Sequence, residues 1–123
     1  MHPRTKKMFD KLNINSKNLF VVPPLAYLEF NYLVRNSIAV ITDSGGITEE
    51  TTFMKIPCIT LRDSTERPET VFIGTNELIG TDLNQICPTI KKLLSKNWKK
   101  GRIPKYWDGR TSKRIVEILL KLK

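Results

Sequence analysis

Histidine and cysteine are scarce in this chain, and their scarcity excludes most metal and thiol chemistry. The 123 residues include one histidine, His2, and two cysteines, Cys58 and Cys87. Neither cysteine has a second cysteine or a histidine at the spacing that metal ligands require. Cys58 lies in an apolar run and Cys87 follows Ile86, so both are expected to be buried free thiols. The sequence therefore predicts no metal site.

Long apolar runs are also missing. No stretch approaches the roughly 20 residues that a membrane-spanning helix needs. The first seven residues lack the apolar segment of a secretory signal. The composition, 40% hydrophobic and 27% charged, is typical of a soluble globular protein. A chain of this length is one domain or part of one. We expect a cytoplasmic protein without a membrane partner.

Acidic residues are rare in the last third of the chain. Residues 1–90 carry a net charge of −1, whereas residues 91–123 carry +10, so the overall +9 is entirely C-terminal. Such a region is usually a solvated face, although it could attract an anionic partner. Its aromatic residues, Trp98, Tyr106 and Trp107, are not interleaved with basic residues as in a known nucleic-acid-binding module. A nucleic-acid partner is therefore not expected.

Apolar periodicity predicts strands that alternate with helices. Because Pro88 would disrupt a helix interior, the pattern around it is divided into a turn at 82–86 and a helix that follows. A charged loop is expected at 62–69 and a basic linker at 97–107. The expected strands are Leu19–Val22, Ile38–Thr42, Pro57–Leu61 and Glu77–Ile79, and the expected helices are Pro3–Leu12, Leu25–Arg35, Gly46–Met54, Pro88–Ser95 and Gly109–Leu122.

This alternation implies an α/β fold of the Rossmann-like type, with a parallel sheet flanked by helices. Ligands of such sheets bind beyond the carboxyl ends of the strands. The segments 42–50 and 62–69 both follow expected strands. We therefore expect these two loops to open on the same edge of the sheet.

The segment Thr42–Glu50, with the sequence TDSGGITEE, has the pattern of a strand, a glycine turn and a helix start. Amides of Ser44, Gly45 and Gly46 at a helix start would favour a phosphate, and glycine lets the anion approach the backbone. Glu49 and Glu50, about one turn into the helix, are placed to accept hydrogen bonds from ribose hydroxyls. An ordinary capped turn explains the same residues, because Asp and Ser cap helices and glycine turns corners.

Six blocks of the sequence, in order and over nearly the whole chain, resemble the C-terminal part of the non-hydrolysing UDP-N-acetylglucosamine 2-epimerases. The blocks are His2–Thr5 (HPRT), Pro24–Phe30 (PLAYLEF), Thr42–Glu50 (TDSGGITEE), Arg62–Glu69 (RDSTERPE), Gly74–Asp82 (GTNELIGTD) and Trp107–Ile115 (WDGRTSKRI). The chain departs from the family pattern at Pro88 and in the segment 52–55.

The resemblance implies two Rossmann-like domains of the glycosyltransferase-B type with the substrate between them. This chain, 1–123, would be a partial C-terminal UDP-binding domain that ends in the helix 109–122, with the N-terminal domain absent. Ser44, Gly45 and Gly46 would hold the UDP diphosphate, Glu50 the ribose, and Phe30 would lie against uracil. Arg67 would face the diphosphate or sugar, and His2 would lie near the cleft. Alternatively, Phe30 belongs to the core, Arg67 pairs with Glu66 or Glu69, and His2 is a loose terminus.

Members of the family invert the sugar at C2 by eliminating UDP and adding it back, and they need no redox cofactor. Their acid and base carboxylates lie in the N-terminal domain, so the resemblance implies no catalytic residue in this chain and no turnover by the chain alone. The expected partners are the UDP-sugar, the missing domain or a second chain, and further copies in a homo-oligomer.

Other functions remain open at this point. A hydrolysing UDP-N-acetylglucosamine 2-epimerase shares this half, and a UDP-sugar glycosyltransferase uses a similar diphosphate loop. A non-catalytic UDP-sugar-binding module is the alternative from a different class, and it would bind UDP without performing chemistry.

Overall fold

The computed structural model describes residues 3–12, 14 and 16–122. The chain divides into two compact units, Met1–Leu33 and Val34–Lys123, which are described separately. None of the helices in the described residues combines the length and apolar character needed to cross a membrane.

The first unit contains helix α1 (Pro3–Lys11) and most of helix α2 (Tyr27–Arg35), whose last two residues belong to the second unit. The start of helix α2 has half of a capping box, because the Glu29 carboxylate accepts a hydrogen bond of 3.0 Å from the Ala26 amide. The strand expected at Leu19–Val22 is wrong. These residues are exposed and form no part of the sheet, and an apolar segment without a neighbouring strand has no ladder to join.

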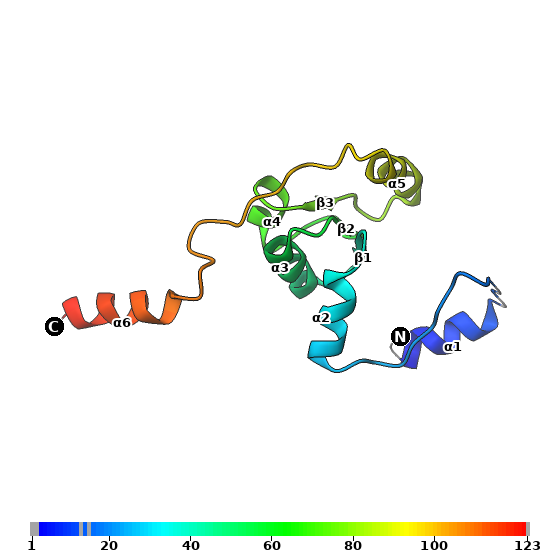
Figure 1. Cartoon of the computed structure of the whole chain (residues 1–123). Helices are drawn as coiled ribbons and strands as arrows, with labels where there is room; N and C mark the ends of the chain where they lie inside the picture. Colours follow the sequence, from blue (N-terminus) through cyan, green and yellow to red (C-terminus); the bar gives the residue numbers. More distant parts are fainter. Residues whose placement is uncertain (1–2, 13, 15, 123) are drawn as a thin grey trace. The chain divides into compact units, whose positions relative to one another are not determined.

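The second unit is built on a parallel sheet of three short strands (Figure 1). Strands β1 (Val40–Thr42), β2 (Cys58–Thr60) and β3 (Asn76–Leu78) lie in the order β1-β2-β3. Thr42 pairs with Thr60, and Thr60 pairs with Leu78, so the three strands end in register. This arrangement confirms the expected parallel α/β sheet and brings the loops after β1 and β2 to one edge.

Helix α3 (Gly45–Met54) connects β1 to β2, and helix α4 (Pro68–Phe72) connects β2 to β3. Helix α3 ends at Lys55, which has left-handed backbone angles and donates its amide to the Thr52 carbonyl over 3.2 Å. Helix α4 lies within and beyond the segment expected to be a loop. Its sequence signal is Pro68 at the first helical position followed by Glu69, a combination that favours a helix start.

Threonine hydroxyls dominate the buried interior of the described residues. The fully buried side chains include Ile59, Cys58 and Asn76 together with five threonines, namely Thr48, Thr51, Thr52, Thr60 and Thr70. Almost all of these hydroxyls are hydrogen bonded, and Thr52 Oγ1 is an exception without a partner in the structure. Because buried polar groups must be paired, this interior specifies its neighbours more strictly than an aliphatic core would.

After β3 the chain forms a 3₁₀ turn (Leu83–Gln85) and helix α5 (Ile86–Leu94). The helix begins two residues earlier than expected, and Pro88 occupies its first turn, where an amide would have no intrahelical partner. Cys87 is exposed on α5, so the expectation that it is buried is wrong; an amphipathic helix has a solvent side that a nearby isoleucine does not exclude.

The segment expected to be a basic linker packs in part against the sheet unit. Trp98 Nε1 donates to the Thr75 carbonyl over 2.8 Å, and the Arg102 amide donates to the Ile73 carbonyl over 2.8 Å. Lys99 Nζ donates to two further backbone carbonyls, those of Val71 and Asn76, and its partial burial lowers the pKa of Lys99. At least three positions of this segment are thus anchored to the loop and strand around β3.

The last helix, α6, spans Thr111–Lys121 rather than 109–122. It starts later than expected because Gly109 adopts a positive φ of 73°, outside the helical region. Just before the helix, Asp108 forms an ion pair with Arg114, and the hydrogen bond from that guanidinium lowers the pKa of Asp108 to about 2.

Candidate functional site

The loop after β1 forms a rigid start for helix α3. Ser44 is the N-cap residue, with extended backbone angles, and its side chain makes no capping hydrogen bond. Its amide instead donates to Thr42 Oγ1 over 3.0 Å. Inside the first turn, the buried Thr48 hydroxyl donates to the Gly45 carbonyl over 2.6 Å. The turn therefore keeps its shape without using the Ser44 hydroxyl.

Two amides at this helix start lack an intrahelical acceptor. Gly45 and Gly46 are the first two residues of α3, and the first amides of any α-helix point away from it unpaired. A Cβ added at Gly46 would meet no atom within 4 Å, so the space beside this backbone is open. An anion can approach the two amides and the positive end of the helix dipole from that side.

The loop after β2 is fastened to the loop after β3. The Asp63 carboxylate accepts a hydrogen bond of 3.1 Å from the Thr81 amide, and Gly80 turns the chain there with a positive φ of 70°. A Cβ at Gly80 would lie 2.9 Å from the same carboxylate oxygen. The segment that begins with Arg62 is thus held at the edge where β1 and β2 end.

Arg67, at the end of this loop, forms an ion pair with Glu49 on α3. The carboxylate that Arg67 contacts is therefore neither Glu66 nor Glu69, the two partners that the sequence suggested. The hydrogen bond and charge of Glu49 raise the pKa of Arg67. The hydrogen bond to Glu49 comes from the Nε atom of Arg67, and the arginine side chain is 55% exposed.

A chain of hydrogen bonds between buried side chains leads from the sheet to the Arg67 backbone carbonyl. Thr60 Oγ1 donates to Asn76 Oδ1 over 2.6 Å, Asn76 Nδ2 donates to Thr70 Oγ1 over 3.2 Å, and Thr70 Oγ1 donates to the Arg67 carbonyl over 2.8 Å. The chain runs from β2 through β3 to α4. It connects the sheet to the backbone of the loop that carries the arginine.

Arg62 lies on the other side of the same loop. Its Nη1 atom is 3.4 Å from the point that a Cβ of Gly45 would occupy, beside the first turn of α3. The residue is half-buried. Reasoning from the sequence selected Arg67 and Glu49 but not their ion pair, and it missed Arg62. The available signal for Arg62 is its place as the first charged residue after the strand expected at 57–61.

The other site residues predicted from the sequence are Glu50, Phe30 and His2. Glu50 is half-buried on α3, about one turn from the helix start. The structure thus brings Ser44, Gly45, Gly46, Glu50 and Arg67 to one edge of the second unit. Phe30 is half-buried on α2 in the first unit, and His2 lies outside the described residues. No three His, Cys, Asp or Glu side chains gather as metal ligands in the part of the chain that the structure describes.

A family model described as UDP-N-acetylglucosamine 2-epimerase matches residues 1–120. The chain belongs to this family. It is 44% identical over 127 positions to the UDP-N-acetylglucosamine 2-epimerase of Methanocaldococcus jannaschii, covering 97% of this chain and 33% of that protein. It is 37% identical to the UDP-2,3-diacetamido-2,3-dideoxy-D-glucuronate 2-epimerase of Pseudomonas aeruginosa, covering 99% of this chain and 34% of that protein.

Solved structures of 2-epimerases have the same fold over this portion. The M. jannaschii enzyme in complex with UDP-N-acetylglucosamine and UDP matches with a TM-score of 0.76 and 43% identity, covering 98% of this chain and 34% of that one. S. aureus MnaA with UDP matches with a TM-score of 0.80 and 30% identity, covering 98% of this chain and 35% of that one. The chain is thus a portion of a glycosyltransferase-B-type fold, and it spans about a third of the length of these 2-epimerases.

Proposed function

We propose that this chain is the UDP-binding portion of a UDP-N-acetylglucosamine 2-epimerase, which interconverts UDP-N-acetylglucosamine and UDP-N-acetylmannosamine. The observation that carries the proposal is the start of helix α3, at the edge of a parallel sheet where ligands bind. There the Gly45 and Gly46 amides have no intrahelical acceptor and the space beside Gly46 is open. A relative of 43% identity, matched over 98% of this chain, was solved with UDP-N-acetylglucosamine and UDP.

We propose one role for each site residue. The Gly45 and Gly46 amides bind the diphosphate, joined by the Ser44 hydroxyl, which is not used as a cap. The Ser44 amide is already bonded to Thr42, so Ser44 contributes through its side chain. Glu50 accepts hydrogen bonds from the ribose hydroxyls, and Arg67 directs its Nη groups toward the diphosphate or the sugar. Phe30 stacks on uracil, and His2 lies near the cleft.

The chemical step belongs to residues outside this chain. Inversion at C2 needs an acid and a base that act on the sugar, whereas the residues gathered here bind the leaving group. We propose that the chain alone does not epimerise, that no cofactor takes part, and that the other two thirds of the epimerase fold supply the acid and base carboxylates. This portion then lowers the barrier only by holding UDP in position while the sugar reacts.

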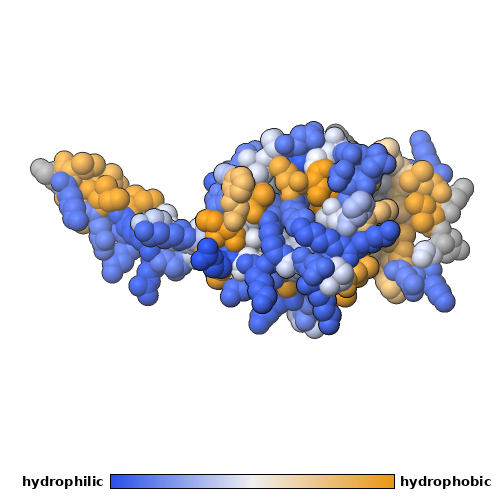
Figure 2. All heavy atoms as spheres, turned by 90° about the horizontal axis from the view of Figure 1, so that it is seen from above, coloured by the Kyte–Doolittle hydropathy of each residue, from blue (hydrophilic) through white to orange (hydrophobic). Residues whose placement is uncertain are grey.

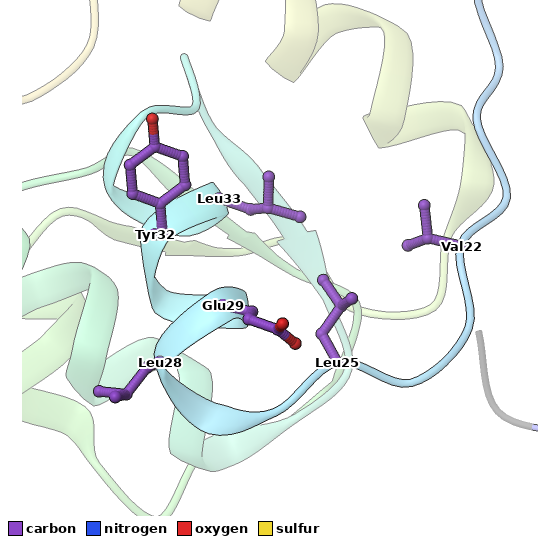
Figure 3. Close-up of a pocket in the computed structure, with 6 residues that line it drawn as sticks. All are labelled: Val22, Leu25, Leu28, Glu29, Tyr32 and Leu33. Atoms are coloured by element: carbon purple, nitrogen blue, oxygen red, sulfur yellow. The ribbon is translucent and has the colours of Figure 1, made fainter.

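Exposed apolar surfaces support a need for that partner. In the first unit, Leu28, Tyr32 and Leu33 of α2 form a hollow of about 550 Å³ together with Val22 and Leu25 of the preceding segment and with Glu29 (Figure 3). In the second unit, helix α6 carries apolar residues along one side and charged residues along the other (Figure 2). Ile118 and Leu119 on its apolar side are 59% and 58% exposed.

We propose that the remaining two thirds of the epimerase fold, on the same polypeptide or on a second chain, cover these surfaces. Apolar patches of this kind mark interfaces rather than solvated faces. The open edges of the small sheet also favour a homo-oligomer. The proposed setting is the cytoplasm, where the enzyme would supply nucleotide-sugars for cell-envelope polysaccharides.

Calorimetric titration of the 123-residue chain with UDP tests the binding role. We expect saturable binding to the chain and a rise in its melting temperature with UDP concentration. Glu50→Ala should lower the affinity for UDP and leave the affinity for pyrophosphate unchanged, because Glu50 contacts only the ribose. The absence of binding at millimolar UDP would refute the proposal.

Turnover tests the second part of the proposal. The chain alone should leave UDP-N-acetylglucosamine unchanged when the products are separated by chromatography. Addition of the complementary two thirds of an epimerase should restore formation of UDP-N-acetylmannosamine. Release of free UDP and N-acetylmannosamine would instead identify the hydrolysing reaction.

A further inference from the structure

Two arginines flank the start of helix α3, and they differ in what they contact. Arg67 is exposed and forms an ion pair with Glu49. Arg62 is half-buried, its Nη1 atom lies 3.4 Å from the Cβ position of Gly45, and it forms no ion pair among the described residues. The more buried of the two arginine residues is therefore the one without a counter-ion in the described part of the chain.

Two carboxylates of the surrounding elements, one beside Arg62 in the sequence and one on helix α3, are engaged elsewhere. Asp63 accepts hydrogen bonds from Thr81, and Glu49 accepts from Arg67. A partly buried charge is stabilised by a partner, and no carboxylate of the described residues forms an ion pair with Arg62. The local arrangement leaves a place for an external anion beside Arg62.

We propose that Arg62 contacts the diphosphate directly and is a further ligand-binding residue of this site. The inference rests on the proposed UDP site and extends it. Its guanidinium and the Gly45 and Gly46 amides all lie at the first turn of α3, and the space beside Gly46 is open. A planar guanidinium binds two phosphate oxygens at once, whereas the helix start binds through single amides. Together they recognise a diphosphate more strongly than a monophosphate.

The division of labour between the arginines follows from these contacts. Arg62 binds the diphosphate at the base of the helix. Arg67, fixed by Glu49 at the outer end of the loop, is left for the sugar side of the substrate. The two arginines come from one loop of six residues, 62–67, so the fold places both with the single turn that follows β2.

Calorimetric titration of the full chain with UDP, UMP, uridine and pyrophosphate tests the proposal. Arg62→Gln should weaken UDP and pyrophosphate binding roughly 10- to 100-fold, as expected for loss of a charge-assisted pair of hydrogen bonds, and should leave uridine binding unchanged. Arg62→Lys keeps the charge but not the planar guanidinium, so its affinity for UDP and pyrophosphate should lie between those of the wild type and Arg62→Gln. Arg102→Gln is the matched control, because it removes one positive charge from an exposed side chain elsewhere.

The outcomes separate this inference from the function it extends. If wild-type chain binds UDP and Arg62→Gln binds it as tightly as Arg102→Gln does, the Arg62 assignment is wrong and the UDP site stands. If the wild-type chain binds neither UDP nor pyrophosphate, both are wrong. If amide NMR shows that Arg62→Gln does not fold, Arg62→Lys is the variant that tests the assignment. Wild-type affinity for UDP in Arg62→Lys would contradict a bidentate contact between Arg62 and the diphosphate.

Discussion

The sheet unit around β1, β2 and β3 and the helix α6 satisfy their side chains in opposite ways. The sheet region buries threonines and Asn76 that bond to one another and to the backbone. Helix α6 contains no buried residue, and its apolar side remains exposed. Almost all buried polar groups of the sheet region are satisfied within that region, whereas the apolar side of α6 is suited to packing against a partner. Stability measurements should therefore respond to the two regions very differently.

The two cysteines offer the largest contrast, because one lies inside the sheet and the other on a helix surface. Burial raises the pKa of the Cys58 thiol, while Cys87 is exposed. Reaction with a thiol reagent at about pH 8 should modify Cys87 at least about a thousandfold faster, since Cys58 reacts only after local or global opening. Mass spectrometry of time points, with Cys87→Ser as the control, measures the ratio. Similar rates would show that the sheet opens freely.

Asn76→Ala should cause a large loss of stability, because it removes the centre of the polar interior. Without the amide, the buried Thr60 hydroxyl loses its acceptor and the Thr70 hydroxyl loses one donor while it keeps the Arg67 carbonyl, at a cost of about 2–4 kcal/mol. Urea unfolding followed by circular dichroism measures the change. Asn97→Ala, on an exposed side chain, is the matched control and should stay within about 0.5 kcal/mol of wild type. Equal curves for the two variants would contradict a cooperative polar interior.

Gly74→Ala should be the next most damaging change. A Cβ there would lie 2.5 Å from Thr52 Oγ1 and 2.6 Å from the Thr70 carbonyl, so the packing must shift at a cost of roughly 1–3 kcal/mol. Gly46→Ala is the control with the opposite expectation, because its Cβ meets nothing within 4 Å. In a helix that alanine should stabilise by roughly 0.5–1 kcal/mol, while UDP affinity falls. Thermal unfolding and UDP titration of both variants separate these effects.

Leu119→Gln on α6 should have the smallest effect on the isolated chain. The side chain is 58% exposed, so its replacement should change the unfolding free energy by less than about 0.5 kcal/mol. The same variant should weaken association with the complementary two thirds of an epimerase, measured by analytical ultracentrifugation. Lys121→Gln on the same helix is the control. A large loss of stability in the isolated chain would show that α6 packs onto this unit in solution.

Much of the sheet was predictable from the sequence, since apolar runs bounded by turn residues contain β1 and β2 entirely and overlap β3. The failure at Leu19–Val22 has the same origin, because an apolar run indicates burial but not the presence of a neighbouring strand. Helix α4 was missed because five residues are too few for a periodic pattern to emerge. Both outcomes depend on tertiary contacts, which a local sequence pattern does not contain.

The candidate site shows the same division. The glycine turn after β1 and the position of Glu50 follow from local sequence, because backbone geometry at a helix start depends on nearby residues. The partner of Arg67 does not, since Glu49 is 18 residues away and becomes a neighbour only when two parallel strands align. The proximity of Arg62 to Gly45 is equally non-local. Charge pairing across loops thus required the structure.

The abundance of threonine in the interior also has a thermal consequence. Exposure of apolar surface raises the heat capacity on unfolding, and exposure of polar surface lowers it. Three hydrophobic residues are buried among those described, Val34, Cys58 and Ile59, against eight polar ones. The heat capacity change of unfolding per residue should therefore be smaller than the value of roughly 12–15 cal/mol/K that is usual for globular proteins. A smaller value flattens the stability curve, so the free energy of unfolding of this chain should vary little with temperature.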